Sequence, residues 1–216
     1  MKLSRSSLFI GVLLLCWGAV AMAADAVMDA VVELQHGWAN AYYVVPEKQK
    51  ENAFKELAAK AHTVSAANPD RVEPMVWEAI ILSSYAKFSG GLSGLSKAKA
   101  ARDLLEKAEK IQPDALNGSI YTSLGSLYYK VPGWPIGFGD KNKAREYLEK
   151  SVKLNPDGMD ANYFYGDFLL EQGEYAKAQE YFQKALAAPP RPGREDADHG
   201  RRAEVQQALE KAKQHG

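Results

Sequence analysis

Four histidines are the first residues of this sequence to consider for chemistry, because imidazole serves as a metal ligand and as a general base. They are scattered, and none stands three or four residues from another, the spacing that places two side chains on one helix face. His199 follows Asp196 and Asp198, but that stretch is polar throughout, which is more typical of an exposed turn than of a metal centre. We therefore predict no metal site.

Two serine–lysine pairs, Ser84-x-x-Lys87 and Ser96-x-x-Lys99, have the spacing of the nucleophile motif of serine acyl-enzymes. The Ser-Asp-Asn and Lys-Thr-Gly segments that accompany this motif are absent from the sequence. Matches to so short a pattern arise by chance in a chain rich in serine and lysine. We expect a protein that is not an enzyme and needs no cofactor.

The most unusual segment, residues 131–140, combines apolar side chains with several glycines and prolines. Those glycines and prolines favour one particular backbone path over a loose one. Because rigid aromatic side chains on loops are common in recognition sites, Trp134 and Phe138 are candidate partner-binding residues. The alternative is that these side chains and Ile136 fold back and fill a groove between neighbouring elements.

A group of arginines near the C-terminus could bind a carboxylate ligand, because guanidinium makes paired hydrogen bonds to carboxylates. Acidic residues occupy the same stretch, and pairing between neighbours is the simpler interpretation. The arginines are Arg191, Arg194, Arg201 and Arg202, and the acidic residues are Glu195, Asp196, Asp198 and Glu204.

The composition is that of an ordinary globular chain. Of 216 residues, 46% are hydrophobic, and 27 basic residues balance 27 acidic ones. A chain with this balance is neither disordered nor strongly basic, so we expect no nucleic-acid partner. A single cysteine excludes a disulfide framework and a cysteine-based zinc site.

Residues 1–23 are predicted to be a signal peptide. Two basic residues precede an apolar run at positions 8–22, and an Ala-Met-Ala cleavage pattern ends at Ala23. The run is short for a membrane span, and the bulky leucine before Cys16 does not fit a lipid-attachment site. We predict cleavage, export to a bacterial periplasm, and a mature chain, residues 24–216, that is not inserted in the membrane.

A repeat organises the mature chain. Pro69, Pro113, Pro156 and Pro190 recur at intervals of roughly 34 to 44 residues, a period that indicates repeated structural units. Proline disfavours helix at the residue before it, so each of them marks a predicted helix end. The segments between them are rich in helix-forming residues and lack strand alternation. The pattern therefore predicts stacked helical hairpins.

The most regular unit spans residues 159–192. Gly166 and Ala178 are small at positions where the two helices of a hairpin approach, and we predict that they pack against each other. Phe182 would fill the space between layers. This unit resembles the tetratricopeptide repeat (TPR), and residues 115–156 resemble it with a longer turn between the two halves.

The predicted fold is all-α: a TPR-like α-solenoid of about four helical hairpins with a capping helix at residues 195–214. A degenerate first hairpin is expected from helices at residues 27–43 and 47–65, and a weaker repeat ends at Pro113. One hairpin cannot bury its apolar face alone, so the hairpins must stack in a single domain.

The TPR resemblance implies a concave surface built from fixed positions of each first helix. Tyr129, Lys130, Tyr163 and Asp167 are among them, and such a mixture of aromatic and charged groups suits a peptide or a small polar ligand. A solvated helix face is the alternative. The full set is Glu73, Val76, Ile80, Ser83 and Ser84, then Ser119, Thr122, Ser126, Tyr129 and Lys130, then Asp160, Tyr163, Asp167, Leu170 and Glu171.

A narrower resemblance is to the T component of TRAP transporters. It is carried by Gly-Phe-Gly-Asp at 137–140, Lys-Ala-Arg at 143–145 and Gly-Arg-Arg-Ala-Glu at 200–204. This resemblance implies a periplasmic interaction scaffold whose protein partner is a solute-binding protein. The alternative function is a small-ligand carrier with a cavity covered by the 131–140 loop.

Overall fold

Helices make up nearly all of the computed structural model, which describes residues 26–215. The expected signal peptide and Cys16 lie outside the described residues. Helical residues 26–39 continue into η1 (Asn40–Val44), a short π-helical turn. The remaining helices are α2 (Glu47–Ala67), α3 (Val72–Ser89), α4 (Gly91–Ile111), α5 (Ala115–Lys130), α6 (Lys141–Leu154), α7 (Met159–Glu171), α8 (Tyr175–Ala187) and α9 (Glu195–Lys213).

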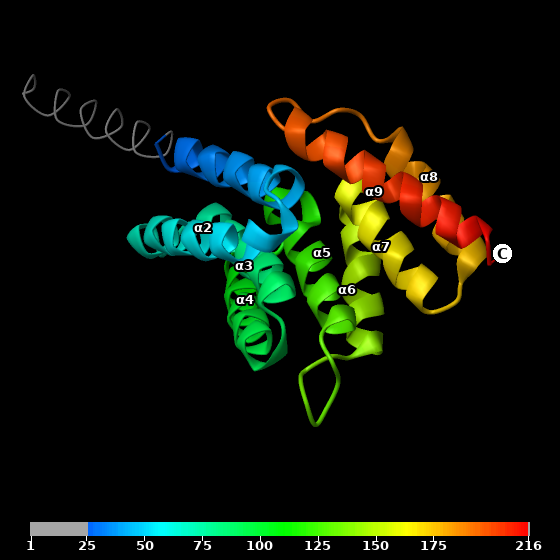
Figure 1. Ribbon diagram of the computed structural model, residues 1–216, viewed down its shortest axis with the longest axis horizontal. Coiled ribbons are helices and arrows are strands. Elements are labelled where there is room, and N and C mark those ends of the chain that lie inside the picture. Colours follow the sequence, from blue (N-terminus) through cyan, green and yellow to red (C-terminus); the bar gives the residue numbers. More distant parts are fainter. Residues whose placement is uncertain (1–25, 216) are drawn as a thin grey trace, which may run out of the picture.

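These helices pack in sequence as hairpins, which confirms the predicted all-α class (Figure 1). Helix α3 pairs with α4, α5 with α6 and α7 with α8, and α9 covers α8. One hydrophobic core extends from α3 to α9, and a second joins residues 26–44 and α2 to α3. No helix within residues 26–215 combines the length and apolar character that crossing a membrane requires.

The helix ends lie where the prolines predict them. Helices α2, α4 and α6 have Asn68, Gln112 and Asn155 as C-caps, each immediately before a proline. Helix α5 begins differently, because Leu116, Asn117 and Gly118 have positive φ angles of 52°, 51° and 82° and form a left-handed turn ahead of the regular helix. Side chains other than glycine and asparagine rarely adopt that conformation.

The small residues of the repeat set the distance between paired helices. A Cβ atom on Gly166 would lie 2.8 Å from Cε1 of Phe182 and 3.4 Å from the Ala178 carbonyl oxygen, which confirms the predicted approach. In the preceding hairpin, a Cβ atom on Gly125 would lie 2.6 Å from Cγ of Leu148. Both hairpins therefore use the same contact in the same register.

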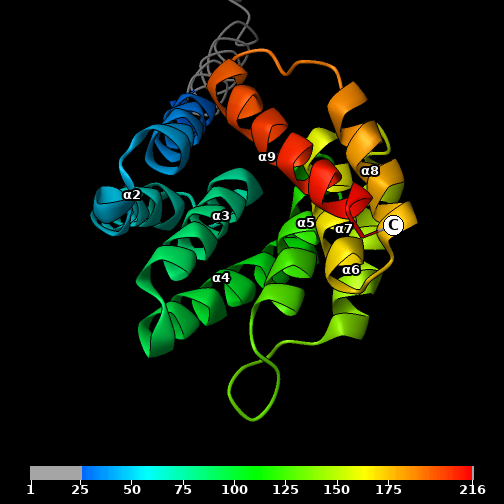
Figure 2. The same cartoon turned by 45° about the vertical axis from the view of Figure 1, so that its right-hand side comes forward.

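The solenoid curls until its first helix meets α9 (Figure 2). Tyr43 donates a hydrogen bond from its hydroxyl to Oε2 of Glu204 over 2.9 Å. Nδ1 of His36 lies 3.1 Å from Oδ2 of Asp196. Ala197 is buried in the core of the N-terminal helices. The capping helix therefore covers the last repeat and also contacts the first hairpin.

Candidate functional site

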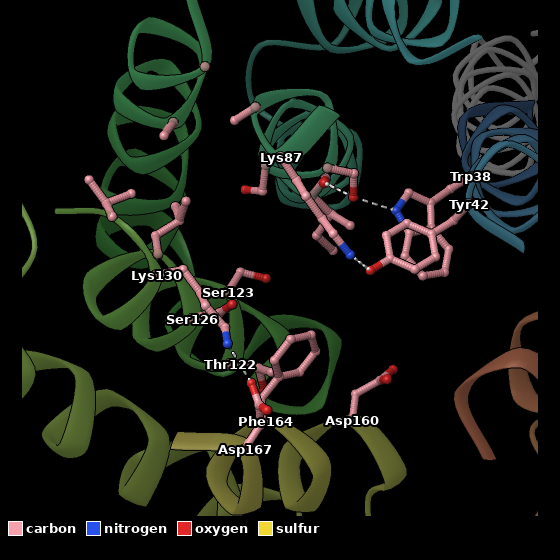
Figure 3. A pocket seen from close by; sticks show the side chains of 18 of the residues that line it. Trp38, Tyr42, Lys87, Thr122, Ser123, Ser126, Lys130, Asp160, Phe164 and Asp167 are labelled. Atoms are coloured by element: carbon pink, nitrogen blue, oxygen red, sulfur yellow. Dashed lines mark hydrogen bonds and ion pairs between the residues drawn. The ribbon is translucent and has the colours of Figure 1, made fainter. Parts of the chain in front are cut away.

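A cavity of about 930 Å³ lies on the inner side of the curled solenoid (Figure 3). Helices α3, α5 and α7 form its concave wall. The rest of the lining comes from α4, from the 131–140 loop, from residues 26–44, and from α9 with the segment that precedes it. This volume falls within the usual range for sites that bind small organic molecules. The predicted concave residues that line it are Ile80, Ser83, Ser84, Ser119, Thr122, Ser126, Lys130, Asp160, Tyr163 and Asp167.

Asp167 joins α5 to α7 at the edge of this cavity. Its Oδ2 accepts a hydrogen bond from the Tyr129 hydroxyl over 2.7 Å and lies 2.8 Å from Nζ of Lys130. Lys130 also pairs with Glu171. Burial, followed by the neighbouring Asp167 carboxylate, raises the pKa of Tyr129 well above its ordinary value. Of the predicted group, Tyr129 is buried and does not line the cavity, whereas Lys130 and Asp167 do.

Asp160 is the centre of a second ion-pair network. Its Oδ1 lies 2.8 Å from Nε of Arg201, and its Oδ2 lies 2.6 Å from Nη1 of Arg191. Burial opposes ionisation of Asp160, but Arg201 and Arg191 overcome this effect and hold its pKa below its usual range. Arg201 also lies over the ring of Tyr163, with its guanidinium carbon 4.6 Å from the ring centroid.

The arginine pairings follow the sequence interpretation only in part. Arg191 pairs with Asp198 and Arg201 pairs with Glu204, as neighbouring charges predict. Asp160, which contacts both arginines, is distant from them in the sequence, so pairing between sequence neighbours could not predict this contact. The only indication in the sequence was that Asp160 occupies one of the predicted concave positions. Arg202 instead donates to the carbonyl oxygens of Leu186 and Ala188.

The two aromatic side chains of the 131–140 loop differ in exposure: one is in solvent and the other is packed inward. Trp134 is 90% exposed and Ile136 is 66% exposed, so the interpretation that they fill a groove is wrong. Phe138 does pack inward, edge-on to Tyr128 with the ring centroids 5.6 Å apart. The backbone N–H of Asp140 donates to the Tyr128 carbonyl oxygen over 2.8 Å and holds the end of the loop.

Three exposed apolar residues, Leu92, Ile136 and Trp134, form what we call the apolar rim: the first two line the cavity, and Trp134 lies two residues before Ile136 on the same loop. Leu92 is 84% exposed at the start of α4, and both Leu92 and Ile136 line the cavity. The loop lies against α4, since a Cβ atom on Gly137 would be 3.3 Å from Cδ1 of Leu95. Exposed apolar groups gathered next to a cavity are typical of interaction sites. The sequence analysis did not identify Leu92.

The N-terminal aromatic residues of the cavity were also missed, because no repeat pattern covers them. Trp38 donates from Nε1 to Oγ of Ser84 over 2.8 Å, and Lys87 donates from Nζ to the Tyr42 hydroxyl over 2.6 Å (Figure 3). Ser84 and Lys87 therefore have separate partners, and no hydrogen bond joins them in the described structure. Within residues 26–215, no cluster of potential metal ligands is present.

Comparison with known proteins identifies the repeat. Residues 136–192 match the family described as tetratricopeptide repeat. A thermophilic TPR protein from Thermus thermophilus superimposes with a TM-score of 0.55 at 18% identity, over 94% of this chain and 96% of that chain. MamA gives a TM-score of 0.44 at 20% identity, over 80% of this chain and 95% of that chain. None of the curated protein sequences matches significantly. Residues 136–192 thus form a tetratricopeptide repeat segment in a chain whose fold is a TPR-like α-solenoid.

Proposed function

We propose that this protein is an exported, non-enzymatic scaffold that holds a protein partner at its apolar rim. The TPR-like fold supports the general role, because TPR domains mediate protein–protein interactions and are generally not enzymes. The N-terminal sequence pattern supports export. The periplasmic partner that we propose is the solute-binding protein of a transporter, and the motifs shared with the T component of TRAP transporters support this choice.

The observation that carries the proposal is the exposure of Trp134 on a well-defined loop. The loop is held at both ends, because Gly139 donates to the Pro132 carbonyl oxygen over 3.0 Å and Asp140 donates to that of Tyr128. An indole that is 90% exposed contributes little to folding, but it can bury a large apolar surface against a partner. Because the loop is already ordered, binding loses little conformational entropy.

Replacing Trp134 with alanine should weaken partner binding and leave the melting temperature unchanged. Aromatic anchors contribute about 2 kcal/mol or more to an interface, so we expect about 30-fold weaker binding. The tagged protein would be used to capture the solute-binding protein from periplasmic extract, followed by titration of the purified pair and a thermal melt.

Leu154→Ala is the matched control for this substitution, because Leu154 is also exposed but lies outside the rim. It should bind the partner as the unmodified protein does. Unchanged capture by Trp134→Ala would refute the role of the rim. A much lower melting temperature would show that Trp134 stabilises the fold.

If the protein is exported, its mature N-terminus can be predicted. Because a small-residue cleavage pattern ends at Ala23, N-terminal sequencing of the periplasmic protein should begin at Ala24 or within a few residues of it. Full-length protein in the membrane fraction, or a lipid on Cys16, would contradict cleavage and would change the proposed attachment.

The cavity supports a second candidate function, that of a small-ligand carrier. At about 930 Å³ it could enclose a small organic molecule, and Trp38, Trp77, Tyr163 and Phe164 give it aromatic walls. The loop contributes Ile136 to the lining while Trp134 points outward, so the loop forms one wall of the cavity. Ligand binding and partner binding would then use adjacent surfaces.

A further inference from the structure

The cavity carries an excess of positive charge, although the chain as a whole is balanced. Three carboxylates line it: Asp160, Asp167 and Glu204. Five basic side chains line it as well: Lys87, Lys130, Arg191, Arg194 and Arg201. A concave surface with more cations than anions attracts negatively charged ligands.

Each of the three carboxylates is already paired. Asp160 binds both Arg191 and Arg201, with Nη1 of Arg191 at 2.6 Å and Nε of Arg201 at 2.8 Å. Oε2 of Glu204 lies 2.6 Å from Nη1 of Arg201. Asp167 pairs with Lys130 at 2.8 Å. The excess charge is therefore on the two remaining cations of the cavity, one lysine and one arginine.

The two remaining cations differ in whether their N–H groups have hydrogen-bond partners. Lys87 is exposed, and its Nζ donates to the Tyr42 hydroxyl over 2.6 Å. Arg194 is half-buried, and its buried Nε has no hydrogen-bond partner. No ion pair among the described residues includes Arg194. A buried donor that lacks a partner destabilises the folded protein. The two Nη groups of Arg194 also have no hydrogen-bond partner among the described residues and are not fully buried, so they can donate to an acceptor supplied by a ligand.

The guanidinium group of Arg194 also contacts an aromatic ring. Its guanidinium carbon lies 5.0 Å from the ring centroid of Trp77, which is buried. Burial and the nearby charge of Arg191 lower the pKa of Arg194, and together they outweigh the opposing effect of the carboxylates of Asp160, Asp198 and Asp196, none of which forms an ion pair with it in the described structure. Arg202, on helix α9, which Arg194 caps, differs because its guanidinium donates to two carbonyl oxygens, those of Leu186 and Ala188.

We propose that Arg194 binds the carboxylate of an amphipathic organic acid, whose apolar body lies against Trp38, Trp77 and Phe164. The planar guanidinium can donate two parallel hydrogen bonds to a carboxylate, and the aromatic wall takes up the apolar part. Inorganic anions lack that second component. This inference deepens the carrier function proposed above and adds the chemical class of the ligand.

The test compares 4-phenylbutanoate with its uncharged amide, 4-phenylbutanamide, by calorimetric titration of the purified protein. Both probes share the apolar body and differ in the carboxylate. We expect the acid to bind at least about tenfold more tightly than the amide, because charge-assisted hydrogen bonds are about twice as strong as neutral ones. Inorganic phosphate at the same concentration should give no heat of binding.

Three variants assign this preference to one side chain. Arg194→Gln should bring the acid and the amide to within about twofold of each other. Arg194→Lys should keep a smaller preference, because it retains the charge and loses the paired donors. Arg202→Gln removes a like charge from helix α9, which Arg194 caps, at a position outside the cavity, and should leave the preference intact. Circular dichroism melts would establish that each variant is folded.

Equal affinity for acid and amide in the unmodified protein would overturn the inference while leaving the carrier function standing. Binding of neither probe would reject both. A preference that survives Arg194→Gln, or one that Arg202→Gln also removes, would show that Arg194 is not the carboxylate site. Heat from inorganic phosphate comparable to that from the acid would show that charge alone is recognised.

Discussion

Asp160→Asn should lower the free energy of unfolding by about 3 kcal/mol. Breaking a buried ion pair by removing one partner costs about 3 to 5 kcal/mol, since the other charge is left without compensation. Here two guanidinium groups each lose one of two carboxylate partners, because Arg191 keeps Asp198 and Arg201 keeps Glu204, and the Arg201 side chain is only 7% exposed. The lower end of the range applies because the Asp160 side chain is 33% exposed toward the cavity.

The same substitution should remove part of the acid sensitivity of the protein. Arg201 and Arg191 lower the pKa of Asp160 in the folded state, whereas an unfolded aspartate titrates near about 3.9. The contribution of this carboxylate is therefore complete above about pH 4 and is lost as the pH falls through the folded-state pKa. Below pH 4, the stabilities of Asp160→Asn and the unmodified protein should converge.

Urea denaturation at pH 7, 4 and 3 would measure both effects. Asp157→Asn makes the same chemical change at an exposed aspartate for which no ion pair is present in the described structure, so its stability should stay within about 0.5 kcal/mol of the unmodified value. A similarly small effect of Asp160→Asn at pH 7 would mean that the network contributes no net stability.

The sequence predicted the helical hairpins because the residues that define them act locally. Prolines end helices through the backbone of the residue before them, and the small residues of a hairpin recur at fixed spacing. The left-handed turn at Leu116, Asn117 and Gly118 could not be predicted in this way. Glycine and, less often, asparagine adopt that conformation as single residues, but three consecutive residues rarely do, and Leu116 has no such tendency.

The curvature of the solenoid could not be predicted from the sequence either, because it depends on contacts between the two ends of the chain. Nothing in the repeat pattern pairs Tyr43 with Glu204 or buries Ala197 among the N-terminal helices. The cavity consequently contains residues that register alone would not include. Trp38 and Arg194 enter it from opposite ends of the sequence.

Several candidate residues that the repeat register selected line the cavity, whereas one does not. Lys130, Tyr163 and Asp167 line it, while Tyr129 is turned into the core between α5 and α7. The environment of Trp134 could not be predicted, since a recognition loop and a groove-filling loop have the same composition. The hydrogen bonds at the loop ends and the inward packing of Phe138 leave Trp134 outside.

Gly166→Leu should destabilise the protein by about 1 to 3 kcal/mol through overpacking between α7 and α8. The first added carbon would already lie 2.8 Å from Cε1 of Phe182, whose side chain is fully buried. Leucine favours helix over glycine by about 0.5 to 1 kcal/mol, which opposes the effect without reversing it. Urea denaturation would give the difference.

Two further variants separate overpacking from a general effect of leucine. Lys153→Leu places leucine on an exposed position of α6 and should change stability by no more than about 0.5 kcal/mol. Adding Phe182→Leu to Gly166→Leu removes the ring that the new side chain meets, so the double variant should lose less stability than the two single changes added together. Additive losses, or an unchanged free energy of unfolding in Gly166→Leu, would mean that the two helices do not meet at this residue and that the register of the repeat is different.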